Sequence, residues 1–227
     1  MYKVSSSCQI SDINSIYTKY FGYPSNGFFI EIGAFDGESF SNTSCLADHG
    51  WKGIYVEPIK SQYLLCMDRH KNNDVIVFQS SIGQIEGEID IFFGGSLTTT
   101  NSEQVDRYSE IEWSKHKSFA IEKCNQIKME TLLNKFNVDK GFDILCVDVE
   151  GQEKDVFDSF NLSYWKPKMM IVELEDNHES FQIYENHVKT QNLLRKEIIN
   201  NGYTEIYKDH VNTIFIRNDI NSKHDNI

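Results

Sequence analysis

The stretch Phe28-Phe29-Ile30-Glu31-Ile32-Gly33-Ala34-Phe35-Asp36-Gly37-Glu38 decides the fold. It begins as a run of β-formers, and Gly33 and Gly37 then allow a positive φ and the close approach of a ligand. Ser41-Asn42-Thr43 follow as candidate N-cap residues for a helix. A strand, a glycine turn and a helix N-terminus in this order predict a nucleotide-type cradle, with Glu31 at the carboxyl end of the strand.

Composition and charge narrow the class of protein. The chain has 227 residues, 40% of them hydrophobic, which suits one globular domain with a full core. The formal net charge of -12 argues against a phosphate-backbone partner, so no nucleic-acid partner is expected. The sequence has no run of about 18 apolar residues and no signal-peptide core, so we expect a cytoplasmic protein without membrane insertion. The 5 scattered cysteines indicate reduced thiols.

Two further predicted strands end in residues suited to a nucleotide. The apolar strand 53–57 ends in Glu57, about twenty residues after the glycine turn, where an acid can accept hydrogen bonds from both ribose hydroxyls. The alternative for Glu57 is an ordinary surface glutamate before a proline turn. The strand 75–83 reaches the small residues Ser80 and Ser81, which leave room for a flat base.

A second dense motif supplies more carboxylates. An apolar strand delivers Asp148 and Glu150 at its end, and Gly151 provides the turn. Two carboxylates this close raise each other's proton affinity unless a positive group lies between them, which favours a base, a metal ion or a sulfonium nearby. The fifth buried strand ends in Glu173, and His178 follows a few residues later.

The order of elements predicts the architecture. Alternating strands and helices that close on a hairpin give an α/β fold with a mostly parallel sheet and one reversed strand. We expect residues 1–27 to form a helical extension that packs on the sheet, 28–217 the main domain, and 218–227 a frayed polar tail. Residues 99–124 are expected to be an irregular lid insertion over the acceptor pocket. The side chains available to line this lid are Tyr108, Trp113, His116 and Phe119.

Over residues 28–216 the chain resembles the FkbM family of S-adenosylmethionine (SAM)-dependent methyltransferases. The ordered blocks are E-I-G-A-F-D-G-E-x-x-S-N-T from Glu31, G-W-K-G-I-Y-V-E-P from Gly50, S-I-G from Ser81, D-V-E-G-Q-E from Asp148 and I-V-E-L-E from Ile171. The resemblance implies a Rossmann-like seven-stranded methyltransferase fold with an antiparallel C-terminal hairpin. Many members have Lys where this chain has Cys146, and a shorter segment at the insertion.

The resemblance also implies a cofactor, a reaction and a set of residues. SAM would donate a methyl group to a hydroxyl, often on a sugar or a glycosylated metabolite. The implied donor-binding residues are Glu31, Gly33, Asp36, Gly37, Ser41, Asn42, Glu57, Ser80, Ser81 and Asp148. In this scheme Glu31 and the glycines hold the methionine part, Glu57 takes the ribose, and the two serines border the adenine. The residues facing the transferred methyl would be Asp148, Glu150 and Glu173.

Two mechanisms are consistent with these carboxylates. Methyl transfer from a sulfonium is an in-line displacement, so positioning supplies most of the rate. Asp148 or His178 could take the hydroxyl proton as a general base. The expected catalytic residues are these two and Glu173. Alternatively, Asp148, Glu150 and Glu173 could hold Mg²⁺ or Mn²⁺ against the hydroxyl and lower its pKa. The alternative for His178 is an ordinary surface histidine. The alternative for the carboxylate cluster is a set of solvated strand ends.

Two other functions stay open at this stage. One is N-methylation of an amine, or methylation of a small non-sugar metabolite. The other is a catalytically silent domain that keeps the fold as an interaction module. The strand-end acids argue against the silent module, because folding does not demand Glu31, Glu57 and Asp148 together. The expected partner is a small-molecule or glycan acceptor.

Overall fold

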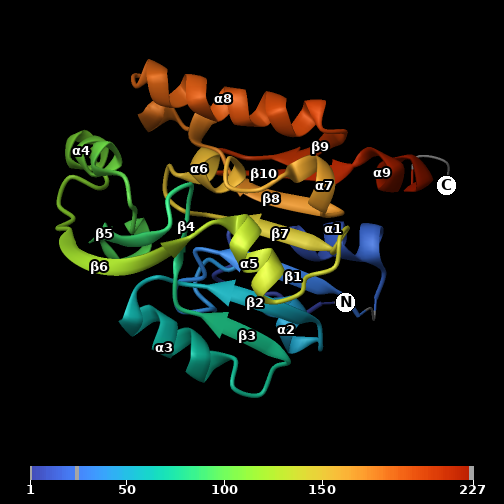
Figure 1. The fold of residues 1–227 in the computed structure, drawn as a ribbon. Helices are drawn as coiled ribbons and strands as arrows, with labels where there is room; N and C mark the ends of the chain where they lie inside the picture. Colours follow the sequence, from blue (N-terminus) through green and yellow to red (C-terminus); the bar gives the residue numbers. More distant parts are fainter. Residues whose placement is uncertain (1, 24–25, 225–227) are drawn as a thin grey trace.

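A seven-stranded sheet forms the centre of the computed structural model, which describes residues 2–23 and 26–224 (Figure 1). The strand order is β3-β2-β1-β7-β8-β10-β9. The strands are β1 (Phe28–Ile32), β2 (Lys52–Val56), β3 (Val75–Phe78), β7 (Ile144–Val147), β8 (Met169–Glu173), β9 (Tyr203–Lys208) and β10 (Asn212–Arg217). β10 is antiparallel to both of its neighbours, and the other pairings are parallel. The predicted mostly parallel sheet with a C-terminal hairpin is confirmed.

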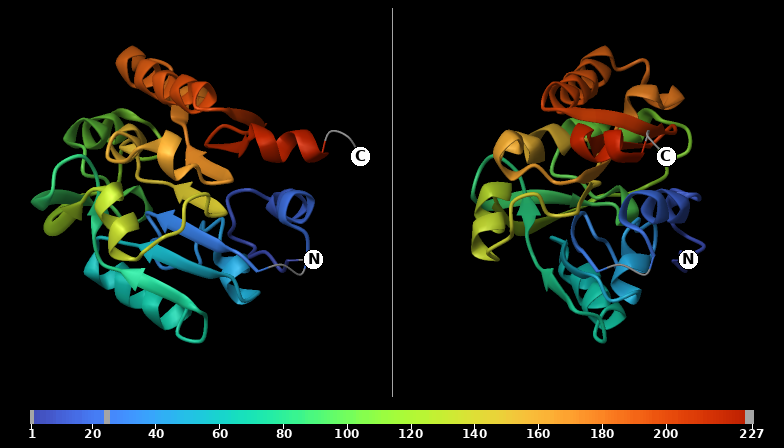
Figure 2. Two further views of the ribbon diagram at one scale, coloured as in Figure 1. Left: turned by 45° about the vertical axis from the view of Figure 1, so that its right-hand side comes forward. Right: turned by 90° about the vertical axis from the view of Figure 1, so that its right-hand side faces the viewer.

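Helices cover both faces of this sheet (Figure 2). Ile30 and Ile32 of β1 point into one apolar cluster and Phe29 into the other, as the two-residue period of a strand requires. The first cluster includes side chains of α5 (Met129–Lys135), α6 (Glu153–Phe157), α7 (Leu162–Trp165) and α8 (Glu185–Asn200). The second includes side chains of α1 (Ile13–Phe21), α2 (Ser44–Asp48) and α3 (Lys60–Arg69). Because helices cover both faces of the sheet, the side chains on both sides of its central strands are buried. This explains the continuous apolar runs in the sequence.

A second sheet of three strands stands beside the carboxyl edge of the first (Figure 1). Its order is β4-β6-β5, with β4 (Ser81–Ile82), β5 (Gly87–Phe93) and β6 (Ala120–Ile127). The prediction of one strand over 75–83 was wrong, because Ser81 leaves the main sheet and pairs with Gln126 of β6.

The predicted irregular insertion at 99–124 is also largely regular. It contains α4 (Ser102–Glu110) and the start of β6, and η1 (Gly95–Leu97) precedes it. α4 begins at Asn101, whose side chain accepts a hydrogen bond from the Glu103 backbone N–H. Only Gln104 and Tyr108 of this helix are buried, so the sequence carries no apolar stripe that would have revealed it.

The prediction of a frayed tail was wrong for its first residues, which form α9 (Asn218–His224). Arg217 Nε lies 2.6 Å from Asp219 Oδ1 in the first turn of α9, and Ile220 packs against the core. Met1, residues 24–25 and residues 225–227, which belong to the predicted extension and tail, lie outside the described residues. Within the described ranges, no helix combines the length and apolarity needed to span a membrane.

Candidate active site

The carboxyl ends of four neighbouring strands open on one cavity. Ile32 of β1 pairs with Val56 of β2 and Val147 of β7, and Val147 pairs with Val172 of β8. The next residues along these strands, which therefore lie in one row across the sheet, are Gly33, Glu57, Asp148 and Glu173. The acidic residues that line the cavity are Glu31, Glu57, Asp148, Glu150, Glu173 and Glu175. Among the described residues, no Lys or Arg lines it.

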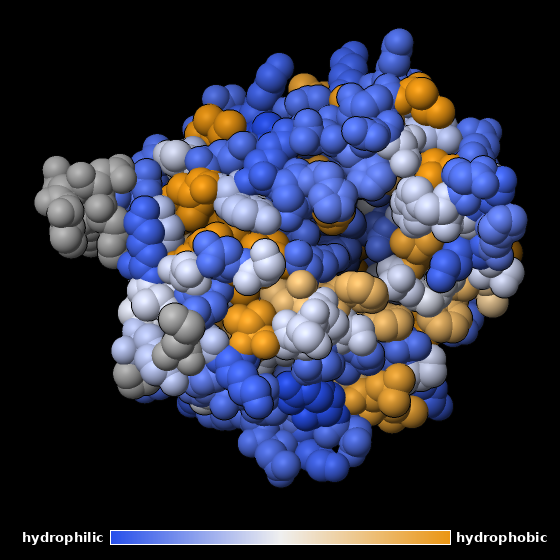
Figure 3. Space-filling view, turned by 180° about the vertical axis from the view of Figure 1, so that it is seen from behind, coloured by the Kyte–Doolittle hydropathy of each residue, from blue (hydrophilic) through white to orange (hydrophobic). Residues whose placement is uncertain are grey.

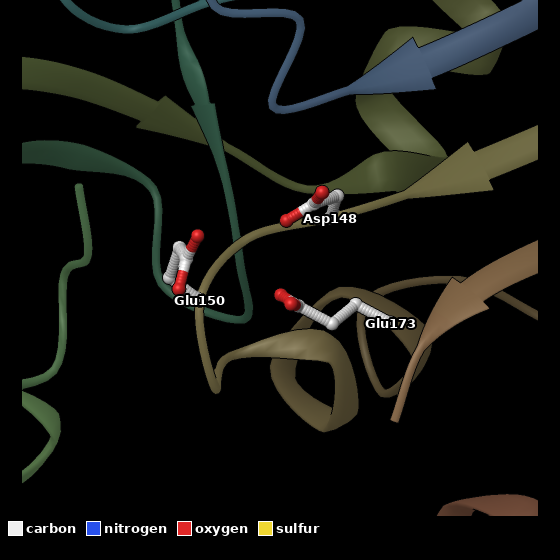
Figure 4. Close-up of side chains that lie close together, drawn as sticks. All are labelled: Asp148, Glu150 and Glu173. Atoms are coloured by element: carbon white, nitrogen blue, oxygen red, sulfur yellow. The ribbon is translucent and has the colours of Figure 1, made fainter. Parts of the chain in front are cut away.

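Asp148, Glu150 and Glu173 point toward one another in this cavity (Figure 4). One carboxylate oxygen of each lies within 4.8 Å of the other two. Glu173 is 6% exposed, and its Oε2 has no hydrogen-bond partner among the described residues. Burial, together with the charges of Asp148 and Glu150, raises the pKa of Glu173 well above its usual range. Three ionised carboxylates this close need a counter-charge, so the cluster must hold a proton or a cation.

Asp148 has a partner that the sequence analysis missed. Gln9 lines the cavity and donates from Nε2 to Asp148 Oδ2 at 2.9 Å. Burial raises the pKa of Asp148, while hydrogen bonds from Glu173 and Gln9 lower it. Gln9 precedes Asp148 by 139 residues, and no local motif marks a single glutamine in an N-terminal extension.

Glu150 is held by the segment predicted to be a lid. Its backbone has a φ of 55°, and its carbonyl oxygen accepts a hydrogen bond from Thr99 Oγ1 at 2.9 Å. Its Oε2 accepts a hydrogen bond from the hydroxyl of Tyr108, a residue of α4 that is 1% exposed. Phe119 stacks on Tyr108 with ring centroids 6.0 Å apart. Of the predicted lid side chains, Tyr108 and Trp113 line the cavity, whereas Phe119 and His116 do not.

Glu31 fixes the start of α2 from the cavity wall. Its Oε2 accepts hydrogen bonds from Ser41 Oγ at 2.8 Å and Thr43 Oγ1 at 2.6 Å. Burial raises the pKa of Glu31 to about 7. Ser41 lines the cavity, but the neighbouring Asn42 does not. Thr43 was named in the sequence analysis only as a cap, and its contact with Glu31 becomes visible once the loop is folded.

Glu57 sits in the cavity wall in one fixed orientation. Its Oε2 accepts a hydrogen bond from the Phe35 backbone N–H at 2.9 Å, and its Oε1 accepts one from the Ile59 N–H at 2.8 Å. Burial raises the pKa of Glu57 to about 8, and the two backbone donors oppose this rise. Each carboxylate oxygen has a further lone pair, so the residue can still accept from a ligand.

Besides Asn42, two predicted donor-binding residues, Asp36 and Gly37, lie outside the cavity lining and shape the loop after β1. Asp36 Oδ1 accepts hydrogen bonds from the backbone N–H groups of Glu38 at 2.9 Å and Ser39 at 2.7 Å. The carbonyl oxygen of Gly37 accepts from His70 Nε2 at 2.8 Å. Direct contact of Asp36 and Gly37 with a ligand stays a prediction that this placement does not support.

Ser80 and Ser81 line the cavity where the main sheet gives way to the smaller one. Ser80 Oγ donates to the carbonyl oxygen of Asn125 at 3.0 Å, and Ser81 Oγ donates to Gln126 Oε1 at 3.2 Å. The two hydroxyl groups therefore tie the cavity wall to β6. That these small side chains border the adenine stays a prediction.

His178 is one of the residues that line the cavity. It lies between η2 (Glu175–Asn177) and η3 (Glu179–Phe181), and its Nδ1 accepts the backbone N–H of Ser180 at 3.2 Å. Because a backbone N–H can only donate, the ring proton of the neutral imidazole sits on Nε2. Burial lowers the pKa of His178 and favours this neutral form.

Glu175 is an acidic lining residue to which the sequence analysis gave no role. It is 4% exposed, and its Oε2 lies 2.7 Å from His187 Nε2 of α8. Gln104 of α4 donates to the same oxygen at 3.2 Å. The sequence did contain a signal for Glu175, which follows Glu173 by two residues in I-V-E-L-E. Both acids lie at the end of the same buried strand.

The sheet order, its single reversed strand and the acidic row at its carboxyl edge define a Rossmann-like methyltransferase fold. The sequence model described as Methyltransferase FkbM domain matches residues 31–205. The chain therefore belongs to the FkbM methyltransferase family, and it is a methyltransferase. No protein in a search of curated sequences matches the chain.

The chain is similar to several solved structures, among them an O-methyltransferase and two fibrillarins. An O-methyltransferase from Bacillus cereus in complex with SAH is 14% identical, with a TM-score of 0.49, and the match covers 94% of this chain and 81% of that one. Fibrillarin from Aeropyrum pernix with natively bound S-adenosyl-L-methionine is 13% identical, with a TM-score of 0.43 and coverages of 84% and 66%. Fibrillarin from Methanococcus jannaschii is 12% identical, with a TM-score of 0.45 and coverages of 85% and 67%. The chain thus spans about two thirds of each fibrillarin chain.

Proposed function

We propose that the protein is an O-methyltransferase that uses SAM to methylate a hydroxyl group of a sugar or glycan. The observation that carries this proposal is the row of strand-end acids around a cavity that no described Lys or Arg lines. A sulfonium is a permanent cation, and buried carboxylates without a partner favour a cation over an anion. A phosphate-bearing ligand is an anion, and the negative charges of these carboxylates would repel it.

The donor would lie along the acidic row. Glu57, fixed by two backbone N–H groups, is placed to accept hydrogen bonds from ribose hydroxyls. Ser80 and Ser81 line the part of the cavity that we assign to the base, and Gly33 and Ser41 line the same cavity. This arrangement leaves Asp148, Glu150 and Glu173 for the sulfonium and the reacting methyl.

For the general base we propose Asp148 and not His178. When bound, SAM supplies the methyl group, which passes to the acceptor oxygen as the carbon–sulfur bond breaks and S-adenosylhomocysteine forms. Asp148 takes the hydroxyl proton as the new bond forms, an effect typically worth about 10²- to 10⁴-fold in rate. The Nδ1 of His178 is occupied by the Ser180 N–H, so His178 donates from Nε2 to the acceptor.

A divalent cation fits the same carboxylate cluster. The carboxylate of the buried Glu173 points toward Asp148 and Glu150, and its Oε2 has no hydrogen-bond partner among the described residues. Carboxylate oxygens are the ligand type that Mg²⁺ and Mn²⁺ prefer. In this alternative, in which Asp148 is a metal ligand and not the base, we propose that Asp148, Glu150 and Glu173 would hold the ion. Such an ion would lower the pKa of a hydroxyl beside it.

The acceptor side of the cavity has a mixed wall. Trp113 and Phe40, which are 50% and 49% exposed, offer aromatic faces, and His178 offers a donor. Apolar rings combined with a few polar groups suit a sugar, which has apolar faces and a rim of hydroxyls. On the molecular face in Figure 3 hydrophilic residues predominate, and apolar residues form a band across its middle.

Incubation with methyl-labelled SAM and a panel of neutral methyl glycosides, read by mass spectrometry, tests this function. The expected result is a mass increase of one methylene on at least one glycoside, lost in an Asp148→Asn variant. Amino sugars belong in the panel, because an acidic cavity would also suit a cationic amine and N-methylation is the second candidate. Methylation of amines alone would move the assignment to that class. Absence of SAM binding by calorimetry would overturn both.

A further inference from the structure

Gln9 joins the N-terminal segment to the reaction centre through an amide whose orientation is fixed. Its Nε2 donates to Asp148 Oδ2 at 2.9 Å, and its Oε1 accepts from Asn42 Nδ2 at 3.0 Å. The Oδ1 of Asn42 accepts the backbone N–H of Ile10 at 3.2 Å. Because a backbone N–H can only donate, Asn42 must turn its NH₂ group to Gln9, and Gln9 must turn its own NH₂ group to Asp148.

The segment that carries Gln9 is itself anchored beside the loop after β1. Ile10 is 0% exposed, so the chain is fixed immediately after Gln9. Cys8 forms a parallel backbone bridge with Phe40, and Ser7 Oγ donates to the carbonyl oxygen of Glu38 at 3.3 Å. The glutamine is therefore held on a rigid support, which is what a positioning contact requires.

Asp148 needs such a contact because it has competing neighbours. It lies in a cluster where one oxygen of each carboxylate is within 4.8 Å of the others, and a free carboxylate there can rotate toward Glu173. One donor bound to Oδ2 fixes the rotation of the group. The hydrogen bond with Glu173 is the second contact that orients the Asp148 carboxylate.

We propose that Gln9 is a positioning residue for methyl transfer, which holds the Asp148 carboxylate in its working orientation and links it to Asn42 in the donor-side loop. This inference rests on the proposed function and adds a part to it. Gln9 lies outside residues 31–205, which match the family, so the N-terminal extension completes the active site as well as packing on the sheet.

Three variants separate a positioning role from packing. Gln9→Met keeps the length of the side chain and removes the donor, whereas Gln9→Glu keeps the bond from Asn42 and places a carboxylate against Asp148. Gln84→Met is the matched control, because Gln84 also donates from Nε2 to a carboxylate, Asp155 Oδ1 at 2.8 Å, on the exposed surface. Each variant is measured by calorimetry with SAM, by thermal unfolding and by initial rates with the methyl glycoside that wild type methylates fastest.

The expected pattern is a split between kcat and binding. Gln9→Met lowers kcat roughly ten- to hundred-fold, the cost of a lost hydrogen bond to a charged group that orients a reacting side chain. Gln9→Glu lowers it further. The KM and calorimetric Kd for SAM stay unchanged in both, and Gln84→Met behaves as wild type. A kcat for Gln9→Met equal to that of wild type would overturn the positioning role and leave the proposed function standing, whereas a wild type that transfers no methyl would overturn both.

Discussion

Gly33 and Asp148 are in contact across β1 and β7: a Cβ added to Gly33 would lie 1.7 Å from the carbonyl oxygen of Asp148. Gly33 also has a φ of +87°, where residues with a side chain are strained. The sequence suggested that this glycine lets a ligand approach. The structure shows that the absence of a side chain at Gly33 also makes room for the backbone at the end of β7. This close packing places Asp148 in the acidic row.

Replacing Gly33 by alanine should therefore disrupt the fold and the site together. Strain at positive φ and overpacking add, so we expect a loss of about 3 kcal/mol or more in the free energy of unfolding. Gly50→Ala is the matched control, because Gly50 has a φ of +84° but no atom within 4 Å of an added Cβ. Its expected loss is about 1 kcal/mol. Urea denaturation measures both, and equal losses would show that the contact with Asp148 is relaxed at little cost.

Asp148→Asn should separate catalysis from binding. The amide keeps the shape of the side chain but cannot take a proton at neutral pH, so we expect kcat to fall about 10²- to 10⁴-fold. SAM affinity by calorimetry should fall much less than kcat, because Glu150 and Glu173 still face the sulfonium. Asp139→Asn, at an exposed position, is the control and should be silent. A fully active Asp148→Asn enzyme would remove Asp148 from the role of base.

The carboxylate cluster should bind Mn²⁺ detectably. Free and bound Mn²⁺ differ in their electron paramagnetic resonance signal, and Glu173→Gln removes an anionic ligand. We expect this variant to weaken Mn²⁺ binding by at least about ten- to hundred-fold, the effect typical of a supporting residue. Glu103→Gln is the control, since the Glu103 side chain is 79% exposed. If a chelator does not change turnover and no Mn²⁺ binds, the metal site is contradicted. The counter-charges of the cluster would then be a proton and the sulfonium.

The sequence predicted this acidic row because its residues follow recognisable strands. Asp148 and Glu173 end apolar runs, and adjacent parallel strands bring their carboxyl ends to one edge. The contact of Gln9 with Asp148, and that of the predicted lid residue Tyr108 with Glu150, could not be predicted in the same way. Each of these two residues reaches the site from a separate element, the N-terminal extension or the polar helix α4, and its contact depends on tertiary packing that no local pattern encodes.

The main strands of the fold could also be predicted, because they are recognisable in the sequence as apolar runs. Apolar runs located β1, β2, β7 and β8, and the closing hairpin located the reversed strand. β4 was missed because strand 75–83 reads as one run, and the change of sheet at Ser81 is decided by its pairing with Gln126. α4 was missed because its exposed face is polar and its N-cap, Asn101, was hidden in a polar stretch.

Buried acids should make the ligand-free protein less stable as the pH rises. Burial raises the pKa of Glu57 to about 8 and that of Glu31 and Glu153 to about 7, from the usual glutamate value of 4.5. The folded state thus binds more protons than the unfolded state between pH 4.5 and 8, and stability falls with pH across this window. Urea denaturation of wild type and Glu57→Gln from pH 5 to pH 8 checks the sign, and the variant should show a shallower decline. A stability that climbs over the same range would contradict the assignment of these buried acids.

The most direct test of the central claim is a crystal structure of the protein with S-adenosylhomocysteine, the product that cannot react. We predict that its ribose hydroxyls lie within hydrogen-bond distance of Glu57, its adenine beside Ser80 and Ser81, and its sulfur toward Asp148. A product molecule bound elsewhere, or a cavity that stays empty at saturating concentration, would contradict the account.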